Sequence, residues 1–143
     1  MNKIGFIYLR HKMAKFLTEL DVKCISDGVW SLDSPLRYQS DIVGLIEVPI
    51  DFQTDFASVP RVPFIYEAFG DRAHREAVLH DYLYRIDSVP LATYSQANNV
   101  FFEAMRERGK GYIVSYGMYW GVVFGGWTAY HKKKVEDKLC QKI

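Results

Sequence analysis

The chain has 143 residues, of which 49% are hydrophobic and 15% aromatic, enough for one core but too little chain for a second independent domain. Its 18 Lys and Arg against 17 Asp and Glu give a formal net charge of +1, so the overall charge does not indicate a nucleic-acid partner. The two cysteines, Cys24 and Cys140, fit neither a metal knuckle nor a disulfide framework. We therefore expect a single domain over residues 1–143, made in a reducing compartment.

Residues 1–21 are interpreted as an N-terminal extension. They begin with MNKIGFIYLRHK, in which Arg10, His11 and Lys12 interrupt the apolar run before it reaches the length of a signal-peptide core. We therefore expect no signal peptide.

Residues 22–63 have the composition of short strands. β-branched and aromatic residues are frequent there, and the turn-forming stretches SDG, DSP and VPIDF separate them. This pattern predicts a small antiparallel β region.

Residues 64–143 have a helical pattern, and the first helix can be placed from its end signals. Gly70 and Asp71 are suited to end the preceding loop and to cap a helix from about residue 72 to residue 86. Pro90 follows shortly after, and proline does not continue a helix. The sequence thus predicts a helix over residues 72–86.

A second helix follows after a short connection. In the stretch TYSQ, Thr93 and Gln96 have the spacing of a capping box, and Gly109 suits the C-terminal cap. Because the connection between the two helices is short, they should pack antiparallel.

The stretch AVLHDYLYRI places His80 and Asp81 inside the first helix. Buried His and Asp side chains cost free energy unless they find partners, so the pair is either an exposed edge or a site. At 3.6 residues per turn, this helix has an apolar stripe and a second face beside it. The stripe consists of Leu79, Tyr82, Leu83 and Ile86, and the second face of Ala73, Ala77, His80 and Tyr84. The two alanines would let another helix approach closely.

On the second helix, four residues share one side: Asn98, Phe101, Phe102 and Met105. We therefore expect Asn98 to face His80 across the helix pair, with Tyr84 as a third polar member. A purely structural network would also bury His, Asn and Tyr side chains that satisfy one another, so both interpretations stay open.

Residues 111–130 contain no charged side chain, and a histidine and three lysines follow them directly. Gly117, Gly121 and Gly125 recur every four residues, a spacing that lets helices touch closely. The segment is long enough to cross a bilayer, but its aromatic residues are not confined to the two ends, and glycines weaken an isolated helix. We favour a buried, glycine-lined core helix, with membrane contact as the alternative.

The stretch HDYLYR, followed by NNVFFEAM, resembles the catalytic helix pair of secreted phospholipases A2, most closely the bacterial and fungal branch. In that family the His is a general base acting through water, the adjacent Asp holds calcium, and a distant Asp orients the His with help from a Tyr. The resemblance implies that His80 is the base, Asp81 a calcium ligand and Tyr84 part of the orienting network. Asn98 stands in place of the orienting Asp, which argues against high activity.

Three stretches in order, VPIDFQTDFASVPR, EAVLHDYLYR and NNVFFEAM, resemble a family of small phage and prophage proteins with no assigned activity, domain-of-unknown-function family 1353. Asp51 stands where this family has Gly, and Asn98 where it has Asp. The resemblance implies a phage context, with synthesis in the cytoplasm of the bacterial host and a place in the virion. The partners it implies are other virion proteins or the lipid of the host envelope. It does not supply a reaction.

The stretch TDFASVPR offers further candidate ligands. Placed beside the His-Asp pair, Asp55 would be a second carboxylate for calcium, and Arg61 a clamp for a phosphate-bearing ligand, with Arg85 as another such candidate. Calcium takes six to eight oxygen ligands, so Asp81 alone is too little. Asp55 can equally bond to the local backbone in a turn, and that alternative stays open.

The sequence thus predicts an α+β fold, in which a small antiparallel β region precedes an antiparallel helix pair and a third, glycine-lined helix. Two functional hypotheses follow. In the first, a phage accessory or virion-associated protein hydrolyses lipid or similar esters during infection at a phospholipase-like site formed by His80, Tyr84 and Asn98. In the second, the protein is a non-catalytic phage structural or interaction protein, and the same helix pair is a core scaffold.

Overall fold

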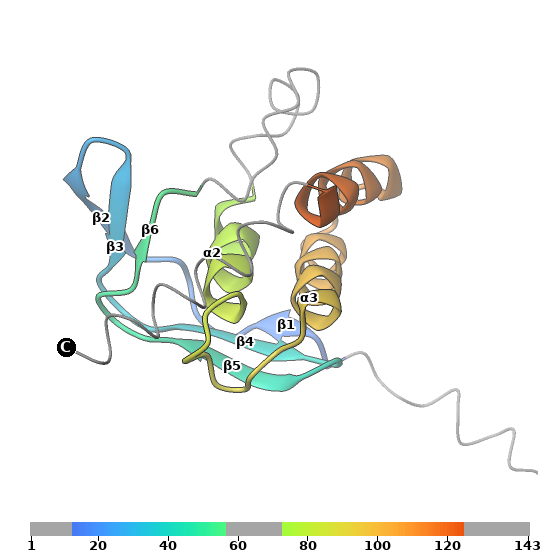
Figure 1. The fold of residues 1–143 in the computed structure, drawn as a ribbon, viewed down its shortest axis with the longest axis horizontal. Helices are drawn as coiled ribbons and strands as arrows, with labels where there is room; N and C mark the ends of the chain where they lie inside the picture. The colour runs from blue at the N-terminus through green and yellow to red at the C-terminus, as the bar shows by residue number, and fades with distance from the viewer. Residues whose placement is uncertain (1–12, 57–72, 125–143) are drawn as a thin grey trace, which may run out of the picture.

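The computed structural model describes residues 13–56 and 73–124, and Figure 1 shows how their elements are arranged. The strands are β1 (Lys15–Phe16), β2 (Val22–Ser26), β3 (Val29–Leu32), β4 (Leu36–Ser40), β5 (Gly44–Val48) and β6 (Gln53–Thr54). The helices α2 (His74–Leu83) and α3 (Tyr94–Glu107) follow, and residues 112–124 are helical as well. The fold is α+β, as predicted.

The described strands form two antiparallel three-stranded sheets. One has the order β1-β4-β5, and the other has the order β2-β3-β6. β1 lies in the segment interpreted as an extension, where Lys15 pairs with Gln39 and Phe16 with Tyr38. The β structure therefore begins at Lys15, earlier than the predicted boundary at residue 22.

The connection between β5 and β6 contains a residue in the left-handed region, Asp51, with φ 66°. Its backbone N–H donates to Leu32 O at 2.9 Å, which ties the connection to the end of β3. Glycine adopts positive φ at no steric cost, and Asp is among the few other residues that tolerate it. Position 51 therefore has a backbone conformation that glycine would adopt without strain.

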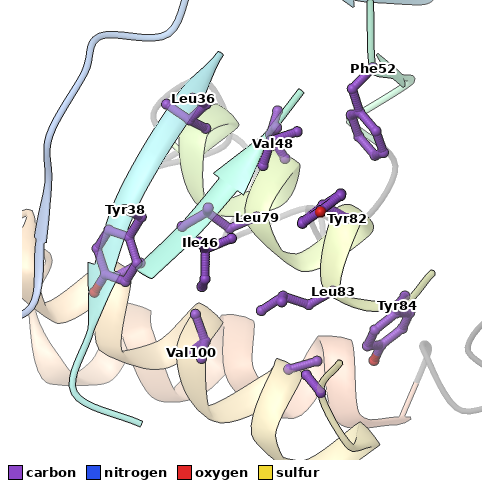
Figure 2. Packing of buried hydrophobic residues seen from close by; sticks show 14 of the residues in the cluster. Leu36, Tyr38, Ile46, Val48, Phe52, Leu79, Tyr82, Leu83, Tyr84 and Val100 are labelled. Carbon is purple, nitrogen blue, oxygen red and sulfur yellow. The ribbon is translucent and has the colours of Figure 1, made fainter. Parts of the chain in front are cut away.

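Figure 2 shows the main core, in which the helices cover one face of the β1-β4-β5 sheet. Alternate residues of β4 and β5 point inward, as expected for a sheet with one buried face. The strand side chains Leu36, Tyr38, Ile46 and Val48 are fully buried, as are Leu79 and Leu83 of α2 and Val100 of α3. Leu79, Tyr82 and Leu83 of the predicted apolar stripe therefore form the face of α2 in this core, whereas Ile86 lies beyond the end of the helix.

Glu103 fixes α3 on this sheet. Its two carboxylate oxygens accept from the Tyr38 hydroxyl at 3.0 Å and from the Asp41 backbone N–H at 3.1 Å. Burial raises the pKa of the Glu103 carboxyl, although these hydrogen bonds oppose the rise. One side chain thus holds both β4 and the β4-β5 turn against the helix.

The helix ends agree with the sequence prediction only in part. α2 ends at Leu83 rather than at residue 86, and its N-cap is Ala73, which makes no side-chain capping bond. The predicted capping residues Gly70 and Asp71 lie outside the described residues. At α3 the capping box is confirmed, because Thr93 Oγ1 accepts from Gln96 N at 3.1 Å and Gln96 Oε1 accepts from Thr93 N at 3.0 Å.

The two helices pack antiparallel, as predicted. Near their connection the rings of Tyr84 and Tyr94 lie 6.0 Å apart, and one turn back toward the N-terminus of α2 His80 contacts Asn98. At the far end Glu76 of α2 contacts Arg108, directly after α3. Residues late in α2 therefore contact residues early in α3, and residues early in α2 contact the end of α3.

The third helical segment, residues 112–124, packs on this pair through Val114, Met118 and Val122. Its partners are Ala73 and Ala77 of the predicted second face together with Phe101 and Met105 of α3. Gly117 and Gly121 lie half-buried beside the packed face, and Gly125 is outside the described residues. Among the described residues, no helix has the length and apolar character needed to cross a membrane.

Candidate functional site

Asn98 joins His80 and Tyr84 in one buried cluster between α2 and α3. Asn98 Oδ1 lies 2.8 Å from His80 Nε2 and accepts a hydrogen bond from the Tyr84 hydroxyl at 2.7 Å. Only 1% of His80, 2% of Tyr84 and 1% of Asn98 is exposed. The contact predicted from the helical pattern is therefore present, and it is enclosed.

The bond to Asn98 fixes the tautomer of His80. An amide oxygen only accepts, so Nε2 carries the proton and donates it to Oδ1. The lone pair of the neutral ring is then on Nδ1, the nitrogen that a water-activating base would use. Asn98 Nδ2 has no hydrogen-bond partner among the residues that the structure describes.

Aromatic rings surround the imidazole of His80. The Tyr84 ring centroid lies 4.0 Å away, and the Phe101 ring meets it edge-on at 5.4 Å. Tyr84, at the C-cap of α2, follows His80 by four residues, and Asn98 and Phe101 are three apart on α3, so each pair lies on one side of its helix. Two short helices are therefore sufficient to hold the ring.

Asp81 is held by the other sheet. Its Oδ2 accepts from Thr54 Oγ1 at 2.9 Å, and only 3% of the residue is exposed. The Thr54 hydroxyl in turn accepts from Phe56 N at 3.0 Å. This bond brings the beginning of the TDFASVPR stretch to the His-Asp pair. Thr54 was not among the predicted site residues, although it directly precedes the candidate Asp55.

The two candidate calcium ligands differ in their surroundings, because Asp81 is buried whereas Asp55 is exposed at the end of β6. In residues 13–56 and 73–124, no three His, Cys, Asp or Glu side chains form a group that could hold a metal ion. Two carboxylates fall short of the six to eight oxygens that calcium takes. Calcium binding by Asp81 and Asp55 therefore stays a prediction.

Of the two candidate ligand-binding arginines, the structure describes Arg85, whereas Arg61 lies outside the described residues. Arg85 donates from Nε and Nη2 to the two carboxylate oxygens of Asp87, at 2.8 and 3.0 Å, and this pairing lowers the pKa of Asp87. Its guanidinium also lies 5.8 Å from the Phe52 ring centroid. Because a carboxylate already occupies this fork, an incoming phosphate would have to compete with Asp87.

Glu76 is a buried carboxylate that the sequence analysis missed. It is fully buried, 3.5 Å from Arg108 Nη1 and 3.7 Å from Lys110 Nζ. Burial raises the pKa of its carboxyl, and the two cations oppose the rise. Its spacing of three to Leu79 and seven to Leu83 puts an acidic residue on the apolar stripe, a signal that was available in the sequence.

Residues 30–122 match the model of a family described as "Protein of unknown function (DUF1353)". The chain belongs to this family. The DUF1353 match runs from β3 into the third helical segment and includes His80, Asp81, Tyr84 and Asn98. No curated protein and no solved structure matches the chain.

Proposed function

We propose that this DUF1353 protein is a phage-encoded accessory or virion-associated protein with a phospholipase A2-like site of low turnover, which hydrolyses lipid or similar esters during infection. The observation that carries the proposal is the bond from His80 Nε2 to Asn98 Oδ1, because it leaves Nδ1 as the basic nitrogen. Three separate stretches of the sequence come together here, because Thr54 donates a hydrogen bond to Asp81 and His80 bonds to Asn98. This convergence further supports the proposal.

In this proposal Nδ1 of His80 takes a proton from a water molecule as the water oxygen attacks the ester carbonyl and forms a tetrahedral intermediate. The ester C–O bond then breaks, the imidazolium returns its proton to the leaving alcohol oxygen, and the carboxylic acid product is released. Asn98 and Tyr84 keep the ring oriented. Calcium held by Asp81 and Asp55 would polarise the carbonyl oxygen. An amide supplies the orienting hydrogen bond but not the negative charge that stabilises an imidazolium, so we expect turnover to be slow.

A second candidate function is a structural or interaction role without catalysis. The burial of the cluster favours it, because His80, Asp81, Tyr84 and Asn98 each expose 3% or less of their surface. A buried polar network with this few accessible atoms stabilises one arrangement of a core. In that case the helix pair is a scaffold for contacts with other virion proteins.

An ester assay distinguishes the two candidates. We expect wild type to be slow or silent on phospholipid vesicles and short-chain esters in the presence of calcium. Asn98→Asp should raise the rate, by up to about four orders of magnitude if the scale of the reverse change in a serine protease triad applies. The added activity should disappear in Asn98→Asp/His80→Ala and, if calcium takes part, when a chelator is added.

Asn99→Asp is the matched control, because Asn99 is the exposed neighbour on the same helix and adds the same charge without touching His80. It should behave as wild type. Circular dichroism would establish that every variant folds. A folded Asn98→Asp protein that is no more active than the double variant would remove the catalytic proposal and favour the scaffold.

A further inference from the structure

The outward face of the third helical segment carries exposed aromatic side chains at every fourth residue. We define the aromatic ladder as Tyr112, Tyr116, Trp120 and Phe124, which are 62%, 51%, 51% and 78% exposed. Ile113 beside them is 90% exposed. The opposite face of the same segment is the one buried on the helix pair. The helix is therefore apolar on both sides, while only one side is covered within the described structure.

The ladder is an ordered surface. The rings of Tyr112 and Tyr116 are stacked with centroids 6.3 Å apart, and those of Trp120 and Phe124 are stacked at 5.6 Å. Phe102 of α3 contacts Tyr116 at 4.9 Å and so anchors the middle of the ladder on the fold. Such contacts limit the freedom of the rings before any partner binds, which lowers the entropic cost of docking.

The chemistry of the ladder favours lipid over a second copy of the chain. Tyr and Trp combine an apolar ring with a polar atom and are enriched where a bilayer meets water. A cation lies at one end of the ladder, since the Arg106 guanidinium is 3.4 Å from the Tyr112 ring centroid. An anionic headgroup would complement this guanidinium, whereas a second copy would bring another arginine to the same surface.

We propose that the aromatic ladder docks the protein onto an anionic phospholipid surface, with the helix lying in the plane of the headgroups. The ladder is separate from the His80 cluster, so docking does not depend on hydrolysis. It gives the protein a lipid partner whether the cluster is catalytic or structural.

Co-sedimentation of the full chain with vesicles tests the proposal. We expect binding to vesicles of phosphatidylcholine mixed with phosphatidylglycerol, and weaker binding to phosphatidylcholine alone. Trp120→Ser/Phe124→Ser should lower the partition coefficient at least about tenfold, because two large apolar side chains no longer enter the lipid.

Ile50→Ser/Leu91→Ser is the matched control, since both residues are exposed apolar side chains outside the helix, at 53% and 64%. This variant should bind as wild type does. Wild type that stays in the supernatant with anionic vesicles would overturn the proposal. So would a wild-type dimer that becomes a monomer in Trp120→Ser/Phe124→Ser without vesicle binding, because the ladder would then be a contact between copies.

Discussion

Asn98 sets the state of His80 through a single oxygen atom. A carboxylate at this position would accept the same hydrogen bond and select the same tautomer, so the orientation of the ring does not depend on the charge. What the amide lacks is the negative charge that would stabilise the imidazolium after it takes a proton. Among the aromatic rings of Tyr84 and Phe101 that difference should be large, because solvent screening is weak there.

Glu76 makes the free energy of unfolding depend on pH, and its contribution decreases as the pH rises. Because burial raises its folded-state pKa, the folded protein keeps this proton to a higher pH than the unfolded chain. Its contribution to stability is therefore greatest below the ordinary glutamate value, about pH 4.3, and decreases as the pH rises toward the raised folded-state value.

We expect Glu76→Gln to remove this decrease. The difference in unfolding free energy between the variant and wild type should shift in favour of the variant as the pH rises from about 4.3 toward neutrality. Urea unfolding at a series of pH values measures it, and Glu47→Gln, on an exposed part of β5, is the control for loss of one charge. A difference that is constant with pH would show that Glu76 titrates alike in both states.

At the scale of single elements, local signals were sufficient to locate α2 and α3, although not the ends of α2, and they were insufficient for the sheets. The capping box of Thr93 and Gln96 depends on residues three apart, and the contact between His80 and Asn98 follows from helical periodicity and a short connection. Strand pairing depends on distant parts of the chain, as in the pairing of Lys15 with Gln39 or of Trp30 with Thr54. Alternation of residues along one strand does not contain that information.

The same distinction between local and long-range contacts explains which parts of the candidate site could be predicted from the sequence. The part of the cluster carried by α2 and α3 was predictable, because both helices present their side chains at fixed intervals. The bond between Thr54 and Asp81 was not, because the position of Thr54 depends on the pairing of β6 with β3. Glu76 was missed for another reason, since an acidic residue on a helix is usually solvated and here is covered by the end of α3.

Substitution of Met118 tests how much the packing of the third helical segment contributes to the free energy of unfolding. Met118 is fully buried in the second core cluster, which also contains Ala77 of α2 and Met105 of α3. Met118→Ala should destabilise the protein by about 2–5 kcal/mol, because it removes buried apolar contacts and leaves a cavity. Denaturant unfolding of Met118→Ala beside Ile113→Ala, whose side chain is exposed, gives the comparison. The Ile113 variant should change stability by no more than about 0.5 kcal/mol, and equal midpoints would contradict the packing.

At the scale of the whole molecule, α2 connects the two sheets. Its apolar stripe lies on the β1-β4-β5 sheet, while Asp81 on the same helix bonds to Thr54 of the β2-β3-β6 sheet. The residues next to the candidate base therefore respond to the positions of both sheets. A change that loosens either sheet should alter the cluster, even at a distance from His80.

The pairings of β1 with β4 and of β2 with β3 determine where the chain can be truncated. The segment shared with the family begins at residue 30, after β1 and β2, yet β1 borders β4 and β2 borders β3. A fragment of residues 30–143 would leave β4 with one open edge and β3 with another, and open edges recruit strands from other molecules. We expect this fragment to aggregate on size-exclusion chromatography, whereas residues 13–143 should elute as the full chain does. A monomeric, cooperatively unfolding 30–143 fragment would contradict this expectation. Fragment boundaries drawn from homology alone would cut an edge strand from each sheet, because the unit of homology in this protein is smaller than the unit of folding.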